Sequence, residues 1–167
     1  KVLLIGADLR NPQIHKYFGL KKNLIGLSDY MYKDNLSLKD IKRKYDNLDL
    51  IFSGTIPPNP VEILSSKKFK SLITQLKKTY DAIIIDSAPC LLVSDSLEIA
   101  ENADTTVYVL RSGHTNIDIS KFINDLHNDK KIKNMSLVLN GVGKSQKYGY
   151  NYAYKYGYGY KYGYGYN

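Results

Sequence analysis

The sequence predicts an α/β fold with a doubly wound, mostly parallel sheet, which is followed by a disordered tyrosine-rich tail. Three observations support this prediction: short aliphatic runs recur along the first 140 residues, segments with helical hydrophobic spacing lie between them, and the last twenty residues contain no Leu, Ile or Val. An alternation of strands and helices is typical of parallel α/β sheets, which bind ligands beyond the carboxyl ends of their strands. A length of 167 residues suits one such domain.

The predicted strands are continuous rather than alternating in their hydrophobicity, which is typical of strands that are buried on both faces of a sheet. Five segments have this character: residues 2–5, 48–52, 82–85, 106–110 and 137–139. The first of them starts at the second residue of the chain, with no signal sequence before it. We therefore expect a piece of a longer protein, with a sheet that is incomplete at its N-terminal side.

Two helices are predicted from apolar residues at helical spacing, and both sets are interpreted as core-facing stripes rather than as sites. They are Phe69, Leu72, Ile73 and Leu76 in one helix, and Ile119, Phe122, Ile123 and Leu126 in the other. Asp95 and Glu98 have the spacing of a capping pair, which predicts a further helix over 96–102. Residues 37–45 fit either a helix or a strand, and the three prolines of 54–60 predict a rigid loop.

The formal net charge of +8 is compatible with nucleic acid, an anionic membrane face or a phosphate-rich ligand. The lysines are dispersed or lie in helix-like runs, so we interpret most of them as solvated surface and expect no nucleic-acid partner. The single cysteine, Cys90, excludes an intramolecular disulfide and is compatible with a reducing compartment. No apolar run approaches the roughly 20 residues that span a bilayer.

The tail places a tyrosine at every second position, namely Tyr148, Tyr150, Tyr152, Tyr154, Tyr156, Tyr158, Tyr160, Tyr162, Tyr164 and Tyr166. Each phenol can accept a phosphate, which would add roughly −1.5 to −2 charges at pH 7. In an extended tail the tyrosines lie roughly 7 Å apart, inside a Debye length of about 8 Å, so neighbouring phosphates would repel one another. The alternative interpretation is a Tyr/Gly low-complexity segment that self-associates by stacking.

Two of the predicted strands end in acids, at the edge where this fold binds its ligands. Asp8 follows the run 2–5 after Gly6 and Ala7, and Asp86 directly follows 82–85. A carboxylate held rigidly at a strand end suits a site near Mg²⁺, usually with water between them. A lone aspartate at such a place is also explained by a turn or a helix cap, but two of them favour the metal site.

With these motifs the chain resembles the bacterial tyrosine kinases of the polysaccharide co-polymerase type, which are relatives of the MinD and ParA P-loop ATPases. Residues 2–10 resemble the Walker A′ motif (Val-Leu-Leu-Ile-Gly-Ala-Asp-Leu-Arg), and 82–86 resemble the Walker B motif (Ala-Ile-Ile-Ile-Asp). Ser53-Gly54 through Pro57-Pro58-Asn59-Pro60-Val61-Glu62-Ile63-Leu64 resemble the signature between them. On this basis residues 1–146 are a partial P-loop kinase domain, and 147–167 are its tyrosine-cluster tail.

The resemblance implies roles for four residues. Asp86 helps to hold Mg²⁺ through the water shell of the ion, and Asp8 lies near both the metal and the incoming tyrosine hydroxyl. Asp8 is the candidate base; because free Asp has a pKa of about 3.9 and Tyr about 10, it would orient the hydroxyl and accept the proton late. Arg10 is a candidate catalytic residue or the partner of a salt bridge to a neighbouring loop, and Asn140 either reads adenine or forms a strand-end turn.

The chain departs from the family pattern at two places. The family motif usually begins with Asp where this chain has Gly6, which removes one carboxylate from the surroundings of the metal. The sequence also contains no G-x-x-x-x-G-K-[ST] loop to cradle ATP phosphates. Gly143-Lys144-Ser145 is no substitute because the preceding glycine spacing is wrong. In the family that loop lies upstream of Walker A′, so we expect this chain alone to bind ATP poorly.

The function that the resemblance implies is ATP-dependent autophosphorylation of the tyrosine tail in trans, within ring-shaped homo-oligomers, which regulates the synthesis and export of a surface polysaccharide. A tyrosine phosphatase and the export machinery would be partners, and the location would be the cytoplasmic face of the bacterial inner membrane. Two alternatives remain: a MinD- or ParA-like ATPase without tyrosine kinase activity, and a non-catalytic interaction protein with an adhesive tail.

Overall fold

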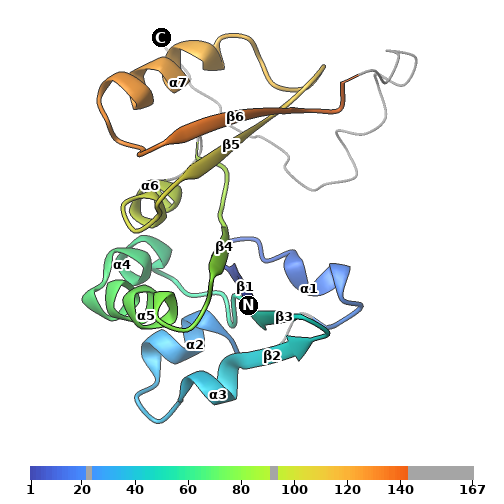
Figure 1. The fold of residues 1–167 in the computed structure, drawn as a ribbon, viewed down its shortest axis with the longest axis vertical. Helices are drawn as coiled ribbons and strands as arrows, with labels where there is room; N and C mark the ends of the chain where they lie inside the picture. The colour runs from blue at the N-terminus through green and yellow to red at the C-terminus, as the bar shows by residue number, and fades with distance from the viewer. Residues whose placement is uncertain (22–23, 91–93, 143–167) are drawn as a thin grey trace, which may run out of the picture.

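The computed structural model describes residues 1–21, 24–90 and 94–142. Strands and helices alternate along most of this range, as the sequence predicts (Figure 1). The elements are β1 (Val2–Gly6), α1 (Ile14–Tyr17), α2 (Leu27–Tyr32), α3 (Leu38–Ile41), β2 (Lys42–Tyr45), β3 (Leu48–Ile51), α4 (Pro60–Ser65), α5 (Lys67–Lys77), β4 (Ala82–Asp86), α6 (Asp95–Ala100), β5 (Thr106–Arg111), α7 (Ile119–Asn128) and β6 (Met135–Asn140). All five predicted strands are therefore found, and the ambiguous segment 37–45 contains both a short helix and a strand.

The strands form two sheets. The first has the order β2-β3-β1-β4, in which β3, β1 and β4 are parallel and β2 pairs antiparallel with β3 at one edge. The second consists of the parallel strands β5 and β6. Figure 1 shows the first sheet with α1 to α5 in one half of the molecule and the second sheet with α7 in the other, while α6 lies between them and packs against α4.

The main hydrophobic core lies under the first sheet, and α5 supplies much of it. The predicted stripe of Phe69, Leu72, Ile73 and Leu76 is buried against β1 and β3. The helix begins after Ser66, whose hydroxyl accepts a hydrogen bond from the Phe69 amide at 3.1 Å. This cap satisfies one of the amides that an α-helix leaves without an internal partner. The helix prediction for this segment is confirmed.

The expectation that every strand is buried on both faces is wrong for the last three strands. Ile84 of β4, Val109 of β5 and Leu139 of β6 are more than half exposed, at 55%, 59% and 57%. These side chains lie on sheet faces that no other element covers, and β4 and β5 are not paired within the described residues, so the sheet is divided. α7 packs on the second sheet through Phe122 and Leu126, which join Tyr108 and Met135 in one cluster.

Two local predictions have different outcomes. The loop 54–59 contains no helix or strand, as expected, and Pro60 occupies the first turn of α4, where its missing N–H is harmless. The capping pair of Asp95 and Glu98 is wrong: α6 begins at Asp95 itself, no side chain caps it, and the Asp95 carboxylate is used elsewhere. In the part of the chain that the structure describes, no helix has the length and apolar character that crossing a bilayer requires. The tail lies outside the described residues.

Candidate active site

The pairing of β1 with β4 brings the two predicted motifs to one edge of the sheet. Gly6 stands opposite Asp86 in the parallel register, and the amide of Ala7 donates a hydrogen bond to the Asp86 carbonyl at 2.7 Å. Asp8 follows two residues after this point of contact. Because both strands run in the same direction, their carboxyl ends meet, and the Asp8 and Asp86 carboxylates share this edge.

Asp8 is held in place by the turn that it begins. Its Oδ1 accepts hydrogen bonds from the backbone amides of Arg10, at 3.1 Å, and Asn11, at 2.9 Å. Only 8% of the residue is exposed. Both bonds use the same carboxylate oxygen, so the side chain has a fixed orientation at the end of β1. Such a carboxylate is preorganised, which is what a group that must orient a reacting hydroxyl requires.

Asp86 is the last residue of β4, and its side chain is exposed. Partial loss of water around the carboxyl group raises the pKa of Asp86, and the negative charge of Asp8 raises it further. The two carboxylates therefore repel each other, and a divalent cation between or beside them would relieve that repulsion. Mg²⁺ typically takes one or two protein carboxylates and completes its shell with water and phosphate oxygens. Within the described residues no group of three or more His, Cys, Asp or Glu side chains is placed to hold a metal ion.

Arg10 forms the salt bridge that the sequence left as an alternative. Its Nε and Nη2 donate to the two carboxylate oxygens of Asp95, at 2.8 and 3.0 Å. Asp95 is completely buried, whereas 44% of the Arg10 side chain is exposed. The hydrogen bond to Asp95 raises the already high pKa of Arg10. A direct catalytic role of Arg10 stays a prediction, and Asp95 is a residue that the sequence reading did not place at the site.

The glycine at the start of the first motif has a steric reason. A Cβ atom on Gly6 would lie 2.8 Å from the Ser53 hydroxyl oxygen and 3.2 Å from the Ser53 amide nitrogen. Ser53 is buried and belongs to the signature segment that follows β3. The close approach of these two segments therefore favours glycine at position 6, because a side chain there would push the Ser53 hydroxyl aside and shift its backbone by a few tenths of an ångström.

A buried carboxylate that the sequence reading missed fixes the signature loop. Asp29, in α2, accepts hydrogen bonds from the Gly26 amide at 3.0 Å, the Thr55 amide at 3.1 Å and the Thr55 hydroxyl at 2.9 Å. Burial alone would raise the pKa of Asp29, but the hydrogen bonds from Gly26 and Thr55 more than offset that effect and lower it. The Gly-x-x-Asp spacing at the start of α2 was the local signal that Asp29 caps this helix. No local signal in the sequence indicates that Asp29 also binds Thr55.

Of the other predicted site residues, Asn140 belongs to the second sheet, and the rest lie outside the described residues. Asn140 is exposed at the carboxyl end of β6, opposite Arg111, and its carbonyl accepts a hydrogen bond from the Ser112 amide at 2.9 Å. Its role in reading adenine stays a prediction. The ten tail tyrosines and the Gly143-Lys144-Ser145 segment fall beyond residue 142, where the description ends.

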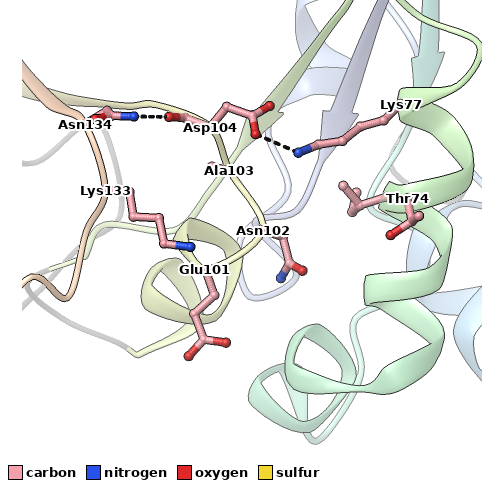
Figure 2. A pocket seen from close by; sticks show the side chains of 9 residues that line it. Thr74, Lys77, Glu101, Asn102, Ala103, Asp104, Lys133 and Asn134 are labelled. Atoms are coloured by element: carbon pink, nitrogen blue, oxygen red, sulfur yellow. Dashed lines mark hydrogen bonds and ion pairs between the residues drawn. The ribbon is translucent and has the colours of Figure 1, made fainter.

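A polar pocket of about 460 Å³ lies elsewhere, between α5, the end of α6 and the start of β6. Figure 2 shows Lys77 and Asp104 pointing toward each other across it, in an ion pair of 2.8 Å, and the Asn134 side chain donating to the Asp104 carbonyl at 2.8 Å. These residues precede β5 and β6, so the pocket is at the amino ends of the strands. It is not the site that contains Asp8 and Asp86, despite its size.

Comparison with characterised proteins gives a consistent family. No model of a known protein family matches the chain. The tyrosine-protein kinase YwqD of Bacillus subtilis is 37% identical over 153 residues, which cover 90% of this chain and 64% of the relative. The tyrosine-protein kinase CpsD of Streptococcus pneumoniae is 33% identical, with coverages of 89% and 66%. The chain thus spans about two thirds of these relatives, and 21% of the longer tyrosine-protein kinase etk of Escherichia coli.

Solved structures support the same conclusion. The VpsO kinase domain superimposes with a TM-score of 0.77 at 32% identity, covering 84% of this chain and 70% of that domain. The kinase domain of the Escherichia coli tyrosine kinase ETK gives 0.77 at 30% identity, covering 100% of this chain and 61% of that one. MinD of Pyrococcus horikoshii, in complex with Mg-ADP, gives 0.64 at 19% identity, which shows the shared α/β fold alone. The chain therefore belongs to the family of bacterial tyrosine kinases.

Proposed function

We propose that the chain is the part of an ATP-dependent protein-tyrosine autokinase that carries the two carboxylates of the transfer site and the acceptor tyrosines. Residues 1–146 would form this part of the kinase domain, and 147–167 would be the substrate tail. The observation that supports the proposal most is the meeting of Asp8 and Asp86 at one sheet edge, in a chain that also ends in ten regularly spaced tyrosines.

The chemistry follows from the positions of the two carboxylates. Asp86 would hold Mg²⁺ through its water shell, and the chemistry that the bound ion supplies is neutralisation of charge on the transferred phosphoryl group. Asp8, fixed by the amides of Arg10 and Asn11, would orient the phenol. The phenol oxygen forms a bond to the γ-phosphorus, the bond from that phosphorus to the bridging oxygen breaks, ADP leaves, and the phenol proton passes to Asp8.

Transfer in trans is compatible with the length of the tail. Twenty residues would reach about 25 Å as a random coil and about 70 Å when fully stretched, which would suffice to enter the site of an adjacent subunit in a ring. Each phosphate adds roughly −1.5 to −2 charges, so full modification would add about −15 to −20 to the tail. Repulsion between such tails would loosen the ring, and a tyrosine phosphatase would reset it.

The biological setting is inferred from the family. Relatives include a putative tyrosine-protein kinase in the cps region of Klebsiella pneumoniae, 37% identical over 158 residues. We infer that this protein regulates the synthesis and export of a surface polysaccharide from the cytoplasmic face of the inner membrane, together with the export machinery. The missing phosphate-binding loop would be supplied by another part of the full-length protein, as the lengths of the relatives allow.

The test is a phosphate-transfer assay on the full-length protein with radiolabelled ATP. Label is expected on tail tyrosines, and Asp8→Asn should abolish it. A variant with all ten tail tyrosines replaced by phenylalanine is the matched control, since it keeps the site but removes the acceptors. Label that appears only as free phosphate would support a plain ATPase of the MinD type. Absence of both products, with self-association that survives the phenylalanine replacement, would support an adhesive, non-catalytic protein.

A further inference from the structure

We propose that the first turn of α6 positions both site carboxylates, with Asp95 fixing the Asp8 loop and Ser96 fixing the segment after Asp86. This inference rests on the proposed function, because it assigns positioning residues to the same phosphoryl-transfer site. Asp95 and Ser96 are consecutive residues, and both side chains bond to loops that leave the carboxyl ends of β1 and β4. One helical turn thus contacts both halves of the site.

The first connection runs from Asp95 through Arg10 to Asp8. The completely buried Asp95 carboxylate binds the Arg10 guanidinium through two hydrogen bonds of 2.8 and 3.0 Å. The backbone amide of the same Arg10 donates to Asp8 Oδ1. A buried ionised carboxylate is stable only when it is paired, and a bidentate arginine pair defines geometry as well as charge. Moving Asp95 would therefore move the residue whose amide orients Asp8.

The second connection runs from Ser96 to the loop after β4. The Ser96 hydroxyl donates a hydrogen bond to the carbonyl of Ala88, and both residues are buried. Ala88 follows Asp86 by two residues, so this bond sets the direction in which the backbone leaves the strand. The sequence offers no local sign of it, since the two bonded residues are eight positions apart.

The two connections assign Arg10 a role that differs from direct catalysis. Its Nε and Nη2, which form one side of the guanidinium fork, are committed to Asp95 rather than directed at a phosphate. In the positioning role, the pair acts as one unit, and loss of either member has the same consequence for Asp8. In a direct role, Arg10 would contribute more than Asp95 and independently of it. These two roles predict different results in a double-mutant cycle.

The experiment uses the full-length kinase with Asp95→Asn, Arg10→Gln, their combination, and Ser96→Ala. Phosphotyrosine formation and ATP hydrolysis are measured separately, each with kcat and KM for ATP. Binding of ADP is followed by calorimetry across Mg²⁺ concentrations, and the folded fraction is determined by urea unfolding. Glu101→Gln is the matched control, because it lies directly after α6 and removes only an exposed ion pair with Lys70 of 3.2 Å.

Asp95→Asn is expected to lower kcat about 10- to 100-fold and to raise the Mg²⁺ concentration needed for ADP binding severalfold, as loss of residues that orient metal-site ligands does. KM for ATP should change by less than about twofold, and the double variant should be no worse than the Asp95 variant. Ser96→Ala, which keeps the buried ion pair, should give a smaller loss of about three- to tenfold in kcat. The Glu101 control should change none of these values.

Three outcomes would overturn the proposal. Arg10→Gln could cost far more than Asp95→Asn with additive effects, which would show direct catalysis by Arg10. The loss of activity could equal the loss of folded protein, with an unchanged Mg²⁺ requirement, which would show a merely structural role. Unchanged ADP binding in every variant would also show a merely structural role, without any measurement of activity. If the wild type hydrolyses ATP without forming phosphotyrosine, while hydrolysis and binding still respond to Asp95→Asn, the proposed function fails and the positioning role stands.

Discussion

The buried pair of Tyr80 and Asp49 predicts a pH-dependent stability whose size follows from the structure. The Tyr80 hydroxyl donates to Asp49 Oδ2 at 2.5 Å, and both residues are 7% exposed. Burial raises the pKa of Tyr80 to about 12, and the hydrogen bond to the Asp49 carboxylate and its negative charge act in the same direction. Lys42 approaches the same carboxylate at 3.8 Å.

The folded state favours the protonated phenol of Tyr80, and this decides the direction in which stability changes with pH. Because the pKa of Tyr80 is higher in the folded state than its usual value of about 10, the contribution to the free energy of unfolding is complete below pH 10 and is lost as the pH rises toward 12. A difference of about two pKa units corresponds to roughly 2.7 kcal/mol. Asp49 acts at the other end: the hydrogen bond from Tyr80 lowers its pKa, so its contribution is lost as the pH falls below about 4.

The assay is urea unfolding of the full-length protein at pH 7, 9 and 11.5, with Tyr80→Phe as the variant. At pH 7 the variant should be less stable by about 2–3 kcal/mol, because it leaves a buried carboxylate oxygen without its donor. That difference should shrink by about 2 kcal/mol at pH 11.5, where the wild type loses the contribution as well. Tyr32→Phe, at a tyrosine that is 53% exposed, is the control. An equal difference between wild type and Tyr80→Phe at pH 9 and 11.5 would mean that the pKa of Tyr80 is not raised in the folded protein.

Three further variants test the packing around the site. Gly6→Ala should destabilise the protein by about 1–3 kcal/mol in urea unfolding, because the added methyl group contacts Ser53. The double variant with Ser53→Ala should recover part of this loss. No recovery would mean that the contact with Ser53 is not the cause. Asp29→Ala should cost about 2–3 kcal/mol and raise the rate of proteolysis in the 53–59 loop, because two amides and a hydroxyl lose their acceptor; unchanged proteolysis would contradict the assigned role. Phe69→Ala should cost about 3–5 kcal/mol from the fully buried core, with a smaller value indicating collapse of the cavity.

The strands and the major helices could be predicted because their signals are local. Aliphatic runs marked β1 and β3 to β6, and helical spacing marked α5, whose stripe is buried as expected. The division of the sheet could not be predicted in this way. The apolar run of β5 resembles that of β1, but Val109 is 59% exposed while Ile5 is fully buried. Periodicity reports the character of a strand and contains no information on what covers it.

The site was predictable to the extent that its motifs follow strands. The ends of β1 and β4 were expected to carry the carboxylates, and the parallel pairing of those strands brings them to one edge. Asp95 was interpreted as a helix cap because its spacing to Glu98 is a local pattern. Its actual partner, Arg10, lies 85 residues away, and such an ion pair leaves no signal in the neighbouring sequence. The part of the site that the sequence motifs did not predict therefore depends on contacts between residues that are far apart in the chain.

The position of the metal in a crystal structure of the full-length kinase with Mg²⁺ and ADP would show whether the sheet edge with Asp8 and Asp86 is the transfer site. An Asp86 carboxylate oxygen should lie about 4 Å from the ion, with one water molecule between them, and Asp8 should face the same ion from the end of β1. An ion bound by other residues, with both carboxylates more than about 8 Å away, would contradict the claim that this edge of the sheet is the transfer site.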